Sequence, residues 1–430
     1  MLESFFRLRE RGTTVAIEAR AGVVTFLTMS YILFVNPQIL AEAGMPASDV
    51  AVATALAAAF ATLTMGLFAD YPIALAPGMG LNAYFTFGVV HGLGIDWQVA
   101  LAAVFVEGIL FLILAMSGAR TAIMRAIPQP LKLATMGGIG LFLAILGFSN
   151  AGWVVDHPAT LVTAGDLTRP GALLALGGLL VIGALMARKV QGAILIGILL
   201  VTGAAWALGI ADPPAEFATL PHLPTETLLA VDFSGLLAGK ALLVVLAFLF
   251  VDFFDTAGTL IGVGRLAGLV DDKGDLPRAN RAFTADAVGT SAGALLGTST
   301  VTSYVESATG VEEGGRTGLT AVVVSGLFML SLFFTPLFVS VPALATAPAL
   351  VVVGALMLVG VRDLEWGRPE IGLPAFLTLV GMPLTYSIAT GISLGIVSWV
   401  VLRILAGRWR ELHPLLTAVA AALVLFYGLR

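Results

Sequence analysis

Long runs of apolar residues, separated by short polar breaks, fill most of the chain. A run of roughly 17 to 23 apolar residues crosses the hydrocarbon core of a bilayer as a helix, and dividing the sequence by this length gives about fourteen segments. In the first half they cover residues 21–43, 48–69, 71–91, 97–117, 129–149, 170–187 and 191–210. In the second half they cover residues 241–264, 282–297, 298–313, 317–341, 345–361, 371–386 and 388–407. One more apolar stretch, 415–427, fits an interfacial helix, which we expect, or a fifteenth span.

This pattern predicts an all-α polytopic membrane protein. Each half holds seven segments, an odd number, so the second half begins on the opposite side of the membrane from the first. Such an arrangement is a 7+7 inverted repeat, and inverted repeats place the substrate near the midplane beside broken helices.

The third segment of each half is interrupted. Residues 71–85 carry Pro72, Pro77, Gly78 and Gly80, too many breakers for a regular helix. Its counterpart, residues 297–306, is rich in β-branched and hydroxyl residues after a glycine. We therefore expect a short extended strand leading into a half-helix in both segments. The two strands would pair, since irregular backbone at membrane depth needs internal hydrogen-bond partners.

Basic residues divide unequally between the two sides of this map, and cytoplasmic loops collect Lys and Arg. With the N-terminus inside, the outer side holds only Arg169 and Lys240. The inner side holds Arg7, Arg9, Arg11, Arg20, Arg120, Arg125, Lys132, Arg188, Lys189, Arg265, Lys273, Arg278, Arg281, Arg316, Arg362, Arg368, Arg403, Arg408 and Arg410. We therefore expect a multi-pass protein of the plasma (inner) membrane with both termini in the cytoplasm.

The composition excludes several classes of protein. With 58% hydrophobic and 11% charged residues and a mean hydropathy of +1.00, the chain cannot be an ordinary soluble domain. The absence of cysteine excludes disulfides and thiolate metal sites. A net charge of −5 argues against a nucleic-acid partner, and the charged N-terminus does not resemble a signal peptide.

Three acidic residues, Asp252, Asp255 and Glu306, lie inside or beside these apolar segments. An ionisable group at the centre of a spanning helix costs about 2.5 to 3.5 kcal/mol, so such a residue indicates a ligand, proton or ion site. Asp252, Asp255, Thr256 and Thr259 follow one another at helical spacing and form a polar stripe, which must face protein or water.

Several motifs carry a family resemblance that extends from near residue 12 to near residue 407. They are Glu18-Ala-Arg-Ala-Gly-Val-Val-Thr-Phe-Leu-Thr-Met-Ser-Tyr-Ile, Asn36-Pro37, Ala76-Pro-Gly-Met-Gly-Leu-Asn-Ala-Tyr-Phe85, Phe253-Phe-Asp-Thr-Ala-Gly-Thr259, Ala285-Asp-Ala-Val-Gly289, Gly297-Thr-Ser-Thr-Val-Thr-Ser-Tyr-Val-Glu-Ser307 and Gly314-Gly-Arg-Thr-Gly318. With these motifs the chain resembles the AzgA-like purine permeases of the nucleobase–cation symporter family. The resemblance implies proton-coupled uptake of hypoxanthine, adenine or guanine.

The resemblance also implies a core domain and a gate domain, each built from parts of both repeats. The implied division is a cytoplasmic N-terminus 1–20, core 21–117, gate 118–210, outer linker 211–240, core 241–341, gate 342–407 and C-terminal segment 408–430.

Site residues follow from the same motifs. Asp255 and Glu306 occupy the positions that hold the base in the wider family, and Asn82 matches the polar residue of the third span. Related uracil and xanthine permeases have a histidine or aspartate where this chain has Thr259.

The chemistry of a purine agrees with this set. Its edge offers ring N–H donors beside ring-nitrogen or carbonyl acceptors, so carboxylates opposed by backbone N–H groups of the two half-helices would match it. Aromatic side chains near the site, among them Tyr31, Phe85, Phe253, Phe254 and Tyr304, are candidates for stacking on the base. The predicted substrate-binding residues are Asp255, Glu306, Asn82, Thr259, Gly80, Ser303, Tyr304 and Phe254.

Two carboxylates close together in apolar surroundings disfavour a second ionisation, so a proton can travel with the substrate. The candidates for carrying the proton are Glu306, Asp252 and Asp255. Sodium coupling through Asp and Thr oxygens remains an alternative, and we expect no cofactor and no bound metal.

Other interpretations stay open. Glu107 and Asp286 suit helix-to-helix hydrogen bonding, and Asn82 suits a half-helix cap. Gly289, Gly293 and Gly297 would let one helix pack closely on its neighbours. The chain can also be a transporter of inorganic anions, uracil or xanthine on the same scaffold, and it can form a homodimer.

An intramembrane hydrolase is a weaker alternative. Gly289-Thr-Ser-Ala-Gly293 fits the G-x-S-x-G pattern of serine hydrolases. The four histidines, His91, His157, His222 and His413, fall at segment ends or in loops, so Ser291 would have no base at membrane depth.

Overall fold

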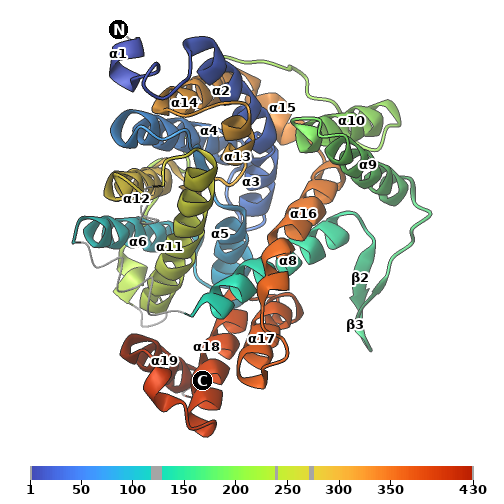
Figure 1. The fold of residues 1–430 in the computed structure, drawn as a ribbon. Coiled ribbons are helices and arrows are strands. Elements are labelled where there is room, and N and C mark those ends of the chain that lie inside the picture. Colours follow the sequence, from blue (N-terminus) through green and yellow to red (C-terminus); the bar gives the residue numbers. More distant parts are fainter. Residues whose placement is uncertain (1, 118–127, 238–240, 271–275, 429–430) are drawn as a thin grey trace. The chain divides into compact units, whose positions relative to one another are not determined.

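The computed structural model describes residues 2–117, 128–237, 241–270 and 276–428 (Figure 1). The chain forms two compact units, Met1–Gly118 with Asp166–Ala349, and Ala119–Gly165 with Leu350–Arg430. Among the basic residues used for orientation, Arg120, Arg125, Lys240 and Lys273 lie outside the described residues. The division into core and gate domains stays a prediction.

The larger unit is helical, as its apolar runs predict. Its first part consists of α1 (Leu2–Phe6), α2 (Val15–Met29), α3 (Ile32–Ala41), α4 (Ala47–Thr64), the π-helix η1 (Met65–Ala69), β1 (Leu75–Pro77), α5 (Met79–Ala83), the π-helix η2 (Tyr84–His91) and α6 (Trp97–Ser117). Its second part consists of α9 (Pro170–Ala187), α10 (Ala193–Ala207), η3 (Ser234–Leu237), α11 (Ala241–Leu266), α12 (Ala279–Leu296), β4 (Val301–Ser303), α13 (Ser307–Glu312), α14 (Gly318–Ser331), η4 (Leu332–Phe334) and α15 (Thr335–Ser340). The helix α16 (Ala343–Met357) begins in this unit.

The two interrupted segments form the strands and half-helices that the sequence predicts. Strand β1 pairs antiparallel with β4, with Leu75 opposite Ser303 and Pro77 opposite Val301. Two backbone bonds extend the pairing, from Gly78 N to the Thr300 carbonyl (3.0 Å) and from Tyr304 N to the Ala74 carbonyl (2.9 Å). Each strand leads directly into a short helix, α5 or α13. Strands from distant parts of the chain therefore satisfy each other's backbone in the interior.

Glycines allow close packing around this pair. A Cβ on Gly78 would lie 2.7 Å from the Thr302 methyl, so a side chain there would collide with β4. On α12, which packs against α4 and α6, a Cβ on Gly289 would lie 2.6 Å from the Cβ of Ala61. A Cβ on Gly293 would lie 2.8 Å from Val301. These contacts confirm the predicted packing role of the glycines on this helix.

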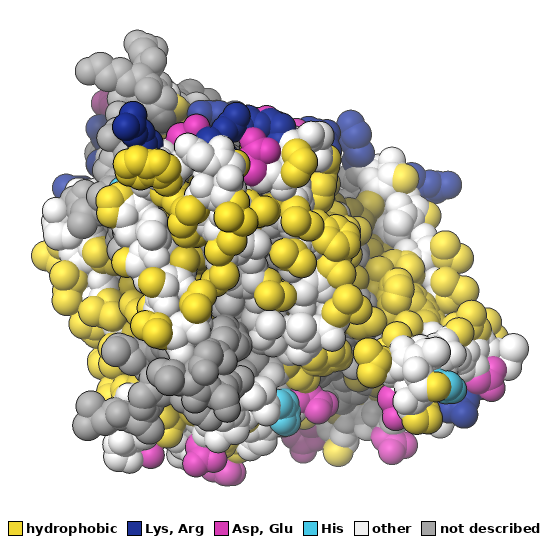
Figure 2. Space-filling view, turned by 90° about the horizontal axis from the view of Figure 1, so that it is seen from below, with side chains coloured by type: hydrophobic (Ala, Val, Ile, Leu, Met, Phe, Trp, Pro, Cys, Tyr) yellow, Lys and Arg dark blue, Asp and Glu magenta, His cyan; other side chains and the backbone are white. Residues whose placement is uncertain are grey.

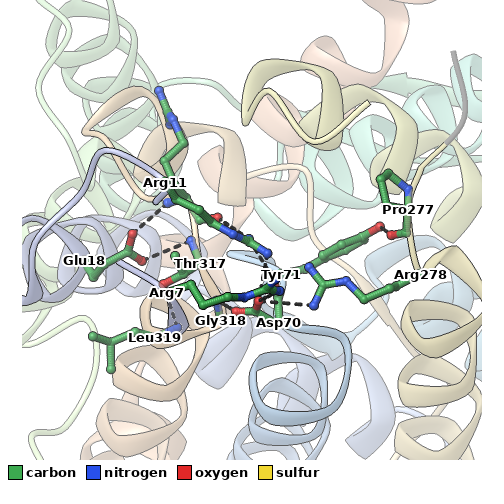
Figure 3. Close-up of polar contacts among 11 residues, drawn as sticks. Arg7, Arg11, Glu18, Asp70, Tyr71, Pro277, Arg278, Thr317, Gly318 and Leu319 are labelled. Atoms are coloured by element: carbon green, nitrogen blue, oxygen red, sulfur yellow. Dashed lines mark hydrogen bonds and ion pairs between the residues drawn. The ribbon is translucent and has the colours of Figure 1, made fainter. Parts of the chain in front are cut away.

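Asp70 anchors the N-terminal segment to both halves of the larger unit (Figure 3). It follows η1 with a left-handed backbone, φ 57°. Its Oδ2 accepts from Arg11 Nη2 at 2.8 Å and Arg278 Nη1 at 3.2 Å, and Arg7 lies 3.8 Å away. Its Oδ1 accepts from the backbone N–H of Gly318 at 2.9 Å. One carboxylate therefore ties together segments distant in the sequence.

Glu18 caps the start of α14 (Figure 3). Its carboxylate accepts from the backbone N–H of Arg316 at 2.9 Å and from the Thr320 hydroxyl at 2.6 Å. The backbone N–H groups of Thr317 and Thr320 lie 3.3 and 3.2 Å from it. A buried acid near the positive end of a helix is electrostatically favoured, which explains a fully buried glutamate in the first turn of α2.

The smaller unit contains the remaining helices and one unexpected hairpin. Its elements are α8 (Gln129–Asn150), β2 (Val154–His157), β3 (Leu161–Ala164), η5 (Leu358–Asp363), α17 (Pro369–Thr385), α18 (Ile388–Leu405), η6 (Trp409–Glu411) and α19 (Pro414–Gly428). The sequence did not predict the β2–β3 hairpin. Helix α19 packs Leu416 and Ala420 against Trp399 and Val400 of α18. The expectation that this helix is interfacial and does not span the membrane stays a prediction.

Apolar side chains cover much of the exposed surface. In the described part of the chain, nine helices are long and apolar enough to cross a membrane. On α4 and η1, Phe60, Leu63 and Leu67 are exposed at helical spacing, a pattern that suits lipid rather than water. Figure 2 shows hydrophobic side chains over most of one face, with Lys and Arg gathered along one edge. The chain is therefore a helical, multi-pass membrane protein, and the count of fourteen spans stays a prediction.

Candidate functional site

The predicted site residues lie where the paired strands, the two half-helices and α11 approach one another. The helix α11 contacts β4, α13 and α5. Because β1 and β4 are antiparallel, α5 and α13 begin at opposite ends of the strand pair, and α11 contacts both helices. Residues from three distant parts of the sequence thus meet in the interior of the larger unit.

Glu306 stands at the N-cap of α13 and is half-buried. Its Oε1 accepts a 2.6 Å hydrogen bond from the hydroxyl of Tyr31, at the break between α2 and α3. The sequence suggested Tyr31 only as a stacking ring. No local pattern links two residues so distant in the chain, so this contact could not have been predicted from spacing.

Asp255 lies on α11 and is also half-buried. Its carboxylate is close enough to the Thr302 hydroxyl on β4 and to Glu306 to interact with both. The structure therefore brings Asp255 and Glu306 together, although one comes from a regular helix and the other from a broken segment.

Asn82 lies on α5 and is fully buried. The hydroxyl of Ser299 donates to its Oδ1. Its Nδ2 has no hydrogen-bond partner among the described residues. The Ser299 contact orients the amide, so that its N–H donors remain for another acceptor.

Two predicted binding residues use their hydroxyls within the protein. The Ser303 hydroxyl donates to Asp286 Oδ1 at 3.0 Å, and the Tyr304 hydroxyl donates to the Pro77 carbonyl at 2.6 Å. Both therefore stabilise the strand pair. Gly80 lies in the first turn of α5, and Thr259 lies on α11 with 9% of its surface exposed. The backbone of Phe254 belongs to α11, but its side chain lies outside the described residues.

Other aromatic candidates belong to the core. The ring of Phe253 stacks on Phe283, with centroids 5.6 Å apart, and it also contacts Phe111. Phe85 is fully buried beside Phe248. These two rings pack inside the protein.

A hydroxyl and carboxylate network lies behind Asp255. The Thr256 hydroxyl is 2.8 Å from both Asp286 Oδ1 and the Thr302 hydroxyl. Asp286 is thus a hydrogen-bonding partner between helices, as predicted. Asp252 and Glu107 are also fully buried, on facing helices α11 and α6.

Ser291 has no hydrolase geometry. It lies within α12 rather than on a strand-to-helix turn, and its hydroxyl donates to the Ala287 carbonyl one turn earlier, at 3.0 Å. A nucleophile elbow requires a sharp turn that exposes the serine.

Comparisons with known proteins find relatives that match nearly the whole chain. The adenine permease AdeP of Escherichia coli (strain K12) is 45% identical over 432 residues, which cover 99% of this chain and 95% of AdeP. The guanine/hypoxanthine permease PbuO of Bacillus subtilis (strain 168) is 43% identical over 429 residues, covering 98% of each chain. Both relatives therefore match nearly end to end.

A solved structure shares the fold. The transmembrane domain of the cyanobacterial bicarbonate transporter BicA superposes with a TM-score of 0.67 at 16% sequence identity, covering 88% of this chain and 97% of that domain. At this identity the likeness concerns the fold alone.

The profile of the permease family (Xan_ur_permease) matches residues 17–426, a range that includes every residue of the site described above. The chain therefore belongs to the permease family and is a membrane transporter rather than an enzyme.

Proposed function

We propose that this chain imports purine nucleobases, namely hypoxanthine, adenine and guanine, and that Asp255, Glu306 and Asn82 bind the base. The observation that carries the proposal is the meeting of two half-buried carboxylates, Asp255 on α11 and Glu306 at the start of α13. The buried, oriented amide of Asn82 lies on α5, which also contacts α11. The names of AdeP and PbuO support the same substrate class.

The geometry suits the edge of a purine. The carboxylates of Asp255 and Glu306 accept from ring N–H groups, and the free N–H donors of Asn82 match a ring nitrogen or carbonyl. Tyr31 holds Glu306 in place, so this acceptor is oriented before the substrate arrives. A site built to hydrogen-bond the substrate discriminates strongly against molecules that lack the matching groups.

Transport in this proposal is proton symport with alternating access. The predicted core domain carries the site, and the predicted gate domain opens it to one side at a time. Protons are the proposed coupling ion because carboxylates dominate the site, and sodium is the alternative.

Anion transport is the competing function on the same fold. BicA is named as a bicarbonate transporter, but its 16% identity extends only to the fold. Asp255 and Glu306 are acids, whereas an anion-binding site would favour positive or neutral groups at these positions. We therefore favour a nucleobase.

Uptake into proteoliposomes tests the proposal. We expect labelled hypoxanthine to enter, adenine and guanine to compete, and bicarbonate to have no effect. A protonophore should abolish accumulation, whereas removal of sodium should not. Bicarbonate transport without purine uptake would contradict the proposal.

In the proposed orientation, the protein lies in the inner membrane and both termini face the cytoplasm. Because the chain contains no cysteine, a single Ser4→Cys variant has one labelling site. A membrane-impermeant thiol reagent should label it only after the cells are opened. Labelling of intact cells would contradict this orientation. We also propose that the chain can form a homodimer. Chemical crosslinking of the protein in membranes, followed by gel electrophoresis, would test this.

A further inference from the structure

Three buried acids lie behind the proposed purine site. Glu107 on α6, Asp252 on α11 and Asp286 on α12 each have 0% exposed surface. Asp286 accepts hydrogen bonds from Thr256 and Ser303 through Oδ1. By contrast, the carboxyl oxygens of Glu107 and Asp252 accept no hydrogen bond from any N–H or hydroxyl donor in the described part of the chain. Buried polar groups are rarely left in this condition.

Glu107 and Asp252 face each other closely enough for their carboxyl groups to share a hydrogen bond. An ionised carboxylate only accepts hydrogen bonds, so a bond between two of them requires a proton on one. Without that proton, two adjacent charges would be buried with no hydrogen-bond donor, at a high cost in free energy.

Among the described residues, the charged groups that act on this pair are acidic. The groups that face it are Asp286 on α12 and Asp255, one turn away on α11. Glu306 on the neighbouring α13 faces Asp255 rather than the pair. Ion pairs of the described residues place no Lys or Arg against Glu107, Asp252 or Asp286. Within the ranges that the structure describes, no Lys or Arg therefore compensates the negative charge of these acids.

A metal ion is a poorer fit than a proton. The described residues contain no group of three or more His, Cys, Asp or Glu side chains placed to hold a metal ion. A proton needs only two carboxyl oxygens at hydrogen-bonding distance, which the Glu107–Asp252 pair provides.

A short polar path connects the pair to the purine site. Asp286, which faces both acids of the pair, contacts the Thr256 hydroxyl at 2.8 Å. Thr256 lies 2.8 Å from Thr302, which interacts with Asp255. Asp255 also acts electrostatically on Asp252, so a change in the charge of Asp255 changes the free-energy cost of charging the pair.

We infer that Glu107 and Asp252 hold one exchangeable proton between them, and that this proton is the one moved together with the substrate. This assignment rests on the proposed purine transport. It separates the proton site from the substrate site, since neither Glu107 nor Asp252 has to touch the base.

The test compares wild-type protein with Glu107→Gln in proteoliposomes, using labelled hypoxanthine. For one proton per purine, an inward gradient of about one pH unit supports at most about tenfold accumulation, because one pH unit corresponds to a tenfold equilibrium factor. We expect the wild type to accumulate purine, and Glu107→Gln only to equilibrate it. Exchange of internal for external purine needs no net proton movement and should persist in the variant.

Glu313→Gln is the matched control. Glu313 pairs with Arg20 at 3.1 Å in a partly exposed position away from this path, and its variant should accumulate purine normally. Accumulation by Glu107→Gln at the wild-type level would overturn the inference. Absence of any purine transport by the wild type would overturn the proposed function instead.

Infrared spectroscopy tests the shared proton without transport. We expect a protonated-carboxyl band in the wild type at neutral pH that is missing from both Glu107→Gln and Asp252→Asn. If one variant fails to fold, comparison of the wild-type spectrum with that of the other variant still tests whether the pair holds the proton. A wild type without such a band would overturn the inference.

Discussion

The hydroxyl of Tyr31 donates a 2.6 Å hydrogen bond to Glu306, a residue 275 positions further along the chain. The bond joins the break between the first two helical pieces to the N-cap of α13. It fixes one carboxylate of the proposed purine site before substrate binds.

Tyr31→Phe should therefore weaken purine binding. The bond orients the acceptor and does not touch the purine, so affinity should fall by no more than roughly 10- to 150-fold, the equivalent of the about 1.5 to 3 kcal/mol that a hydrogen bond to a charged group contributes. Isothermal titration of purified protein with hypoxanthine measures this loss.

Tyr304→Phe is the matched control for Tyr31→Phe. The Tyr304 hydroxyl donates to the Pro77 carbonyl inside the protein, so its removal should lower the melting temperature more than the purine affinity. Equal affinity losses in the two variants would contradict a specific role for Tyr31.

Substitutions of Asn82 and Ser299 should reduce purine uptake to different extents. Asn82→Ala removes the amide N–H donors proposed to bind the purine, and we expect loss of measurable uptake. Ser299→Ala removes only the contact that orients this amide, so uptake should fall by a smaller factor. A larger defect in Ser299→Ala than in Asn82→Ala would reverse the assigned roles. Initial rates of labelled hypoxanthine uptake by the two variants make the comparison.

Asp70→Asn should destabilise the protein. Burial lowers the pKa of the Arg11 guanidinium, Asp70 acts in the opposite direction, and Arg278 and Arg7 add to the lowering. Without the carboxylate, these cations repel one another, and Glu18 is the one acid still acting on Arg11 among the described residues. Breaking a buried ion pair on one side costs about 3 to 5 kcal/mol, and the Asp70 side chain is only 11% exposed.

Thermal unfolding in detergent checks the Asp70 prediction, with Asp166→Asn as the control. Asp166 pairs with Arg169 at 3.6 Å, but both side chains are more than half exposed, so its loss should change little. Similar melting temperatures for the two variants would show that the Asp70 cluster does not stabilise the fold.

Gly108→Ala should disturb the packing of α6 on α12. A Cβ at this position would lie 2.9 Å from the backbone nitrogen of Ser291 and 3.1 Å from the Ala287 carbonyl. Overpacking of this kind costs about 1 to 3 kcal/mol. In Gly177→Ala the new methyl group meets nothing within 4 Å, so that variant should keep or slightly raise the melting temperature. A neutral Gly108→Ala would contradict the close approach.

Much of the helical fold follows from the sequence because apolar runs of sufficient length leave few alternatives in a membrane. The predicted segment 97–117 corresponds to α6 (Trp97–Ser117), and segment 170–187 corresponds to α9 (Pro170–Ala187). The breakers around Pro77 also identified the strand β1. The β2–β3 hairpin was missed because it is short and lies outside the apolar runs.

The site was only partly predictable, for a different physical reason. An ionisable side chain is costly inside an apolar segment, so Asp255 and Glu306 can be recognised from the sequence as candidate site residues. Partners such as Tyr31 for Glu306 or Ser299 for Asn82 are set by tertiary packing, which periodicity does not encode. The hydrogen bond from the Ser303 hydroxyl to Asp286 was likewise not predictable, and the role of Ser303 in substrate binding stays a prediction.

Equilibrium binding of hypoxanthine to purified protein, measured beside Asp255→Asn and Glu306→Gln, tests the central claim most directly. We predict saturable binding to the wild type that adenine and guanine displace, and an affinity reduced at least about tenfold in each variant, as expected for loss of a hydrogen bond to a charged group. Binding of equal strength in the wild type and both variants would contradict the claim that these two carboxylates hold the purine.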